Sequence, residues 1–199
     1  MTTIHKLKAN GILWVKNMLK CHQTKTKHGS ISYLLFGAKP SEQSLNIKMG
    51  RFGEFLAKEL IKQNTHLQLL TCGVQSINNT KKDVDLIFIN KHLKIIYYRE
   101  LKGNIKLDTE KLPATIDKCN IIHKHLQTKY PEYTNNFGLL HWSVYNRELL
   151  TDGITNIKMF EINGIKIDHM HDFLQLIDVK WEKEDYYKYF KKLGHLIKK

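Results

Sequence analysis

The chain has 199 residues, 42% of them hydrophobic and 26% charged, which is enough for one sizeable globular domain. No apolar run approaches the roughly 18 residues that a membrane-spanning helix needs, and the N-terminus lacks the apolar core of a secretory signal, so we expect a cytoplasmic protein. The net charge of +13 favours a polyanionic partner such as DNA, RNA or an acidic membrane, although a lysine-rich composition from an AT-biased genome explains it equally well.

The N-terminal half predicts two helices followed by strands. Apolar residues recur at helical spacing over residues 3–20 and 45–62, with a polar stretch rich in lysine and threonine after the first helix. The strands that we expect next are 67–75, then, after a turn at 78–80, 84–89 and 94–101, which a tight turn around His92 joins.

The C-terminal half predicts helices again, with one strand and one hairpin among them. Pro113 suits the first position of a helix, and the helical pattern continues to about residue 128. The remaining elements are a strand over 137–145, a hairpin over 157–167 that turns at Asn163-Gly164, and helices over 171–177 and 182–198.

This order of elements predicts an α/β (α+β) fold with a central mixed β-sheet flanked by helices. We expect a single domain over residues 1–199, in which 1–46 form the N-terminal helix and a polar loop, 47–178 the core, and 179–199 the C-terminal helix. The sequence does not predict a zinc site, because its three cysteines are widely spaced and the pairs His123/His125 and His169/His171 lack further ligands at suitable spacing. We therefore expect the histidines to be solvated or at polar interfaces.

Acidic residues interrupt two strands that should otherwise be apolar. Asp83 and Asp85 precede Leu-Ile-Phe-Ile, and Glu100 follows Ile-Ile-Tyr-Tyr-Arg. A turn centred between His92 and Leu93 would place Asp85 opposite Glu100, with the two Cβ atoms about 5 Å apart. Because buried carboxylates are costly without a partner or a function, these acids are the strongest functional signal in the sequence.

A divalent cation between two adjacent carboxylates relieves their repulsion, and hard oxygen ligands suit Mg²⁺. Asp85 and Glu100 would then be metal ligands, with the backbone carbonyl of Leu101 as a third oxygen. Lys102 shares a strand face with Glu100 and could orient or activate a water for attack on phosphorus. The alternative is a purely structural salt-bridged cluster across a hairpin.

One short pattern resembles the signature of PD-(D/E)XK nucleases. It consists of Asp85, fourteen intervening residues, and Glu100-Leu101-Lys102. The residues that follow resemble the same region of type II restriction endonucleases; they are Lys102-Gly-Asn104-Ile-Lys106-Leu-Asp108-Thr-Glu-Lys111. A looser likeness covers about residues 45–175. The resemblance implies a restriction-endonuclease-like fold and a catalytic site of Asp85, Glu100 and Lys102. The proline that the family places before the first acid is absent, which leaves Asp83 as a rival of Asp85.

Further residues receive roles only through this resemblance. Glu54, on the helix before the sheet, could supply another catalytic acid for a second metal ion, or could be a solvated surface residue. Arg51 could contact phosphates. The remaining candidates for DNA contact or support are Asn104, Lys106, Asp108 and Lys111.

The resemblance implies a Mg²⁺-dependent type II site-specific deoxyribonuclease that hydrolyses double-stranded DNA as a homodimer. Two Mg²⁺ ions per site are expected, with Mn²⁺ as a substitute. One alternative is a structure-specific repair or junction-resolving nuclease of the same fold. The other is a catalytically inactive nucleic-acid-binding protein. Recognition sequence and cut position depend on side chains that the sequence does not identify.

Overall fold

The computed structural model describes residues 3–21, 34–35, 42–103, 111–147, 161–162 and 164–197. The chain forms two compact units, residues 1–56 with 182–199, and residues 57–181. None of the helices in the described ranges is both long and apolar enough to cross a membrane.

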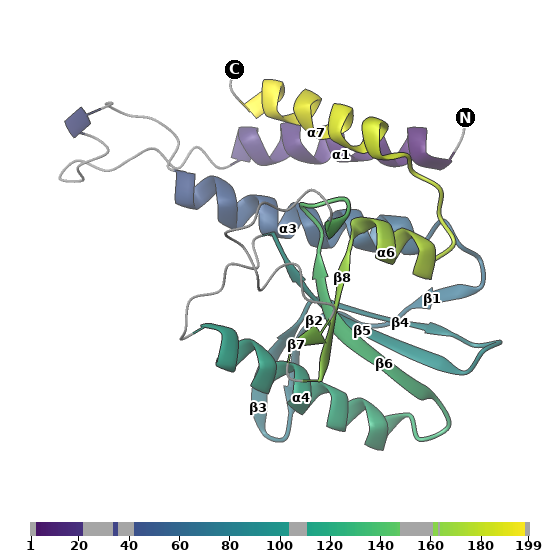
Figure 1. The fold of residues 1–199 in the computed structure, drawn as a ribbon. Helices are drawn as coiled ribbons and strands as arrows, with labels where there is room; N and C mark the ends of the chain where they lie inside the picture. The colour runs from purple at the N-terminus through teal and green to yellow at the C-terminus, as the bar shows by residue number, and fades with distance from the viewer. Residues whose placement is uncertain are drawn as a thin grey trace. The chain divides into compact units, whose positions relative to one another are not determined.

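The first unit is helical. It contains α1 (Thr3–Cys21), the greater part of α3 (Glu42–Ile61) and α7 (Lys183–Ile197), and α1 lies alongside α7 (Figure 1). Phe52 packs at the centre of this unit, with its ring 5.4 Å from Trp14 and 6.0 Å from Phe190. All three helices agree with the spacing of apolar residues in the sequence to within three residues at each end.

The second unit is built on a mixed sheet with helices on both of its faces (Figure 1). In the described residues the sheet has six strands in the order β1-β4-β5-β6-β8-β7, and β2 and β3 form a separate hairpin. The strand bounds are β1 Leu67–Leu69, β2 Gly73–Ile77, β3 Thr80–Val84, β4 Leu86–Asn90, β5 Ile95–Lys102, β6 Thr134–His141, β7 Glu161–Ile162 and β8 Ile165–His169. The helices are α4 (Lys111–Lys129) and α6 (Met170–Leu176). The predicted α/β class with a mixed sheet is therefore confirmed.

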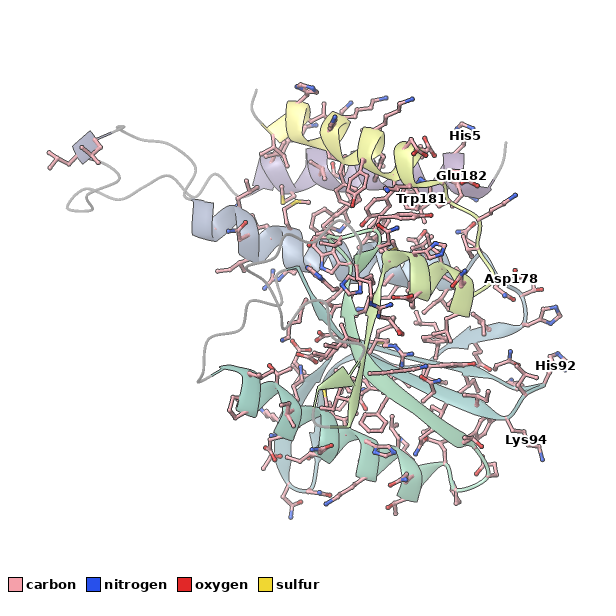
Figure 2. All side chains as sticks on the ribbon, in the orientation of Figure 1. His5, His92, Lys94, Asp178, Trp181 and Glu182 are labelled. Atoms are coloured by element: carbon pink, nitrogen blue, oxygen red, sulfur yellow. The ribbon has the colours of Figure 1, made fainter. Side chains whose placement is uncertain are left out.

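The turn between β4 and β5 determines which residues of these two strands face each other. The side-chain oxygen of Asn90 accepts hydrogen bonds from the backbone amides of His92 and Leu93. Lys94 closes the turn with a φ of 51°, and the side chains of His92 and Lys94 point away from the sheet (Figure 2). The two strands pair antiparallel with Leu86 opposite Arg99, which is the register predicted from the sequence.

The sheet continues beyond β5 in parallel. β5 pairs with β6, and β6 pairs with β8, both parallel. A parallel pair needs a long crossover, and α4 lies within it. The buried side chains of α4, which are Cys119, Ile122 and Leu126, pack in one hydrophobic cluster with residues of the sheet such as Ile96 and Tyr98. Even-numbered residues of β5 therefore face α4.

The opposite face of the sheet packs on α6. Phe88 of β4 stacks on Tyr97 of β5 at 4.6 Å, and Phe173 of α6 meets Phe88 edge-on at 6.3 Å. Arg99 also belongs to this face and is completely buried. Its guanidinium donates to Asp168 of β8 at 2.7 Å and to the side chain and backbone of Asn136, so the charge is fully paired.

Several predicted strand limits were wrong. The strand expected over 67–75 is two strands, because Gly73 adopts a φ of 93° and β2 pairs with β3 instead of joining the large sheet. β3 was not predicted, since its residues are mostly charged and exposed. The strand expected over 137–145 is β6, which begins at Thr134 and ends at His141. The hairpin at Gly164 is present as β7 and β8, and residues 157–160 lie outside the described residues.

Gly138 of β6 is expected to tolerate no side chain. A Cβ atom there would lie 2.5 Å from the backbone carbonyl oxygen of Lys166 on the neighbouring strand β8. Since backbone atoms of a paired strand cannot move independently, Gly138→Ala should lower the free energy of unfolding by about 1–3 kcal/mol. Urea unfolding measures this loss. Gly50→Ala is the matched control, because a Cβ atom on Gly50 of α3 would meet nothing within 4 Å; it should stabilise its helix by about 0.5–1 kcal/mol.

Candidate active site

Asp85 and Glu100 lie beside each other at one end of the sheet. Asp85 immediately precedes β4, and continuation of the β4–β5 register places it opposite Glu100. Both residues are buried, with 9% and 3% of their surface exposed. One carboxylate oxygen of Asp85 accepts a hydrogen bond of 2.8 Å from the backbone amide of Leu101. The side chain of Asp85 is therefore held against β5, close to Glu100.

The Glu100 carboxylate is surrounded by hydrogen-bond donors. Lys102, two residues further along β5, donates from Nζ to Oε1 at 2.9 Å. The buried hydroxyl of Tyr98 donates to Oε2 at 2.8 Å. All three side chains project from the face of β5 that α4 covers, because they are separated by two residues each. This alternation brings a carboxylate and an ammonium together without any contribution from a loop.

Lys118 of α4 completes the cluster, and it was not among the site residues predicted from the sequence. Its Nζ lies 2.6 Å from Oε2 of Glu100 and 3.6 Å from Oδ1 of Asp85. Lys118 follows Thr115 by three residues and precedes Ile122 by four, so it borders the helix face that packs on the sheet. The sequence shows that Lys118 borders the apolar stripe of this helix, but it does not show that the side chain reaches the two carboxylates.

The electrostatics of the cluster favour ionised groups. Burial acts to raise the pKa of Glu100, but the ammonium groups of Lys102 and Lys118 outweigh burial and lower it from its ordinary value. Burial likewise acts to lower the pKa of Lys118, and the charges of Asp85 and Glu100 reverse this effect and raise it. Glu100 is therefore a carboxylate and Lys118 an ammonium at neutral pH.

The donor chemistry of the site fits a hard divalent cation. In the described part of the chain, no group of three or more His, Cys, Asp or Glu side chains is arranged to hold a metal ion. Mg²⁺ needs fewer protein ligands, since one or two carboxylates suffice when waters and substrate phosphate supply the rest. Asp85 and Glu100 are two such carboxylates, and the ammonium of Lys118 lies within 4 Å of both, where a cation is favoured.

The structure describes only some of the other residues expected from the sequence. Asp83 is exposed on β3, whereas Asp85 is buried in the cluster. Arg51 is exposed and Glu54 partly exposed on α3, in the first unit of the chain. Three further candidates, Asn104, Lys106 and Asp108, lie outside the described residues, and of Lys111 only its position at the start of α4 is described.

Two buried histidines lie in register with Lys102 on the next two strands of the sheet. His141 ends β6, where it pairs with Lys102 of β5 and with His169 of β8. The two imidazole rings are 5.4 Å apart, and both residues are buried. His169 is not solvated, because it is completely buried where β8 runs directly into α6. It does lie at a polar contact, since its Nδ1 is 3.7 Å from the carboxylate of Asp172 and its backbone amide donates to the same carboxylate.

The stability of the fold should fall in mild acid because of His141. Burial, with a smaller contribution from His169, lowers the pKa of His141 from 6.5 to about 4. The unfolded chain therefore binds a proton below pH 6.5 that the folded chain binds only near pH 4, so unfolding is favoured as the pH falls through this window. The loss approaches about 3 kcal/mol for a shift of this size.

Urea unfolding at a series of pH values across this window measures the effect. The variant His141→Gln, which cannot gain a proton, should lose correspondingly less stability between pH 6.5 and pH 4. His92→Gln, at the exposed turn, is the matched control and should follow the wild-type curve. Equal pH dependence of wild type and His141→Gln would contradict the assignment to His141.

Comparison of the chain with protein-family models, with curated proteins and with solved structures finds no match.

Proposed function

We propose that this protein is a Mg²⁺-dependent endonuclease that hydrolyses phosphodiester bonds in double-stranded DNA, of the type II restriction class. The observation that carries the proposal is the pair of buried carboxylates, Asp85 and Glu100, on adjacent strands with Lys102 beside them. The site also lies at the carboxyl end of β5, and open α/β sheets bind ligands at the carboxyl ends of their strands.

Asp85 and Glu100 would hold the metal ion, with the carbonyl of Leu101 as a further oxygen ligand. When bound, Mg²⁺ supplies positive charge that polarises the phosphate and makes a nearby water more acidic. Lys102 contacts Glu100 through Nζ, which fixes the ammonium at the edge of the carboxylate pair. From there it orients the attacking water and neutralises charge that develops on the phosphate oxygens.

The net charge of +13 supports a nucleic acid as substrate, because lysine and arginine side chains release counterions when they neutralise phosphates. A homodimer is proposed together with this activity, since a two-fold symmetric enzyme matches a palindromic DNA site. Affinity for duplex DNA should therefore fall steeply as the salt concentration increases.

A second candidate function follows from the charge balance of the site. Asp85 and Glu100 carry two negative charges, and Lys102 and Lys118 carry two positive charges. Such a cluster of paired charges also suits a structural ion-pair network in a protein that binds DNA without cleaving it. The two candidates differ in a measurable property, because only a nuclease requires Mg²⁺ for its effect on DNA.

The test is digestion of plasmid and phage DNA by the purified protein with Mg²⁺, with Mn²⁺, and with EDTA. Discrete fragments that need the metal and disappear in Lys102→Ala support the restriction-type enzyme. Cleavage of branched substrates alone supports a structure-specific nuclease and contradicts the restriction class. Duplex binding without cleavage of any DNA contradicts the nuclease proposal and supports the binding protein.

A further inference from the structure

Lys118 occupies a different position from Lys102 in the carboxylate cluster. Among the described residues, the ammonium of Lys102 is paired with Glu100 only, through Oε1 at 2.9 Å. The Nζ of Lys118 lies within ion-pair distance of both acids, 2.6 Å from Glu100 and 3.6 Å from Asp85. An ammonium between two carboxylates stands where a divalent cation would gain the most from both charges.

The carboxylate oxygens themselves distinguish the two lysines. Oε1 of Glu100 is bonded to Lys102, and Oε2 is shared by Lys118 and the hydroxyl of Tyr98. Oδ2 of Asp85 accepts a hydrogen bond from the backbone amide of Leu101, and Oδ1 of Asp85 lies 3.6 Å from Nζ of Lys118. Lys118 therefore bridges one oxygen of each acid, Oδ1 of Asp85 and Oε2 of Glu100.

From this geometry we infer that Lys118 occupies the divalent-cation position of the site, and that metal binding displaces its ammonium group. The inference rests on the proposed function, since it concerns the same carboxylates. Each acid of the pair already has an ammonium group within ion-pair distance, so a divalent cation bound between the two acids would repel these ammonium groups. The repulsion acts most strongly on the nearest ammonium, which is that of Lys118.

Displacement is feasible because Lys118 retains a route to solvent. Its side chain is 21% exposed, and its four-carbon stem extends from a helix and can rotate without any change of backbone. Once displaced from between the carboxylates, the ammonium remains beside them on α4. It is then available to a phosphate oxygen of a substrate that has entered the site.

The experiment is a calorimetric titration of the full-length protein with Mn²⁺ in the absence of DNA, which needs no catalytic activity. Lys118→Met keeps the apolar stem and removes the competing charge, so Mn²⁺ should bind at least about tenfold more tightly. Lys118→Ala should act in the same direction, and thermal unfolding of both variants checks that they are folded. Lys124→Met is the matched control, because Lys124 is exposed on the same helix. This variant should bind Mn²⁺ with the affinity of the wild-type protein.

The outcomes separate this inference from the proposed function. If Glu100→Gln abolishes Mn²⁺ binding while folded Lys118→Met binds Mn²⁺ with unchanged or weaker affinity, the carboxylates hold the metal and the inference about Lys118 is overturned. If Glu100→Gln binds Mn²⁺ as wild type does, the metal site itself is overturned. Tighter binding in Lys118→Met together with loss of binding in Glu100→Gln supports both.

Discussion

Replacement of Glu100 by glutamine is expected to lower the rate of Mg²⁺-dependent DNA cleavage by about a thousandfold. The change keeps the shape of the side chain but removes a negative charge that would hold the metal ion. Metal stabilisation of the transition state contributes several kcal/mol, and each 1.4 kcal/mol corresponds to about a tenfold change in rate. Single-turnover cleavage of a plasmid at saturating protein concentration measures the effect without interference from product release.

The matched control is Glu132→Gln, because Glu132 is exposed in the turn before β6. Its cleavage rate should equal that of wild type. Stability must be measured with activity, since Glu100 is the ion-pair partner of Lys102 and Lys118. Both lysines are about one-fifth exposed and can turn to solvent, so we expect a folded variant. A folded Glu100→Gln protein with wild-type cleavage would contradict the proposed mechanism.

The central part of the site could be predicted because it depends on local geometry. Glu100 and Lys102 share a strand face through their two-residue spacing alone. The position of Asp85 depended on a register across a hairpin, and that register followed from the short turn around His92. A slip of one residue would have turned Asp85 to the opposite face. The side chain of Asn90, which accepts hydrogen bonds from the turn amides, fixes the length of the turn.

Lys118 could not be placed from the sequence for the opposite reason. Its contact with Asp85 and Glu100 depends on the rotation and depth at which α4 packs on the sheet. The apolar residues of α4 restrict the rotation, because Cys119, Ile122 and Leu126 must face the core. Which flanking side chain then reaches the carboxylates depends on the position of the helix along β5, and no local pattern encodes that position.

The hairpin of β2 and β3 shows a second limit of sequence patterns. Apolar alternation predicts half-buried strands, but β3 has one buried residue, Val84. Its conformation is stabilised by pairing with β2 and by the turn at Asn78 and Asn79, both of which have positive φ values. The turn was predicted because asparagine tolerates that conformation. The strand after it was missed because its side chains contribute almost nothing to the core.

Asp85 and Asp83 should differ sharply in their contribution to cleavage, although they are only two residues apart. Asp85 is buried and bonded to the amide of Leu101 beside Glu100, whereas Asp83 is exposed on β3. Asp85→Asn should reduce Mg²⁺-dependent cleavage by about a hundredfold to a thousandfold, because the amide ligates a hard cation more weakly than a carboxylate does. Asp83→Asn, the matched control, should cleave within about twofold of wild type, because screening weakens the influence of an exposed charge.

The variant Asp85→Asn tests metal binding and not folding, because the side-chain oxygen of the asparagine can still accept the hydrogen bond from the backbone amide of Leu101. The free energy of unfolding of Asp85→Asn should therefore stay close to that of wild type, and urea unfolding checks this. Raising the Mg²⁺ concentration should partly restore cleavage, since the variant retains Glu100 as a ligand. A large loss of cleavage in Asp83→Asn, with Asp85→Asn unaffected, would assign the metal to the exposed acid and would mean that the buried pair is an ion-pair network.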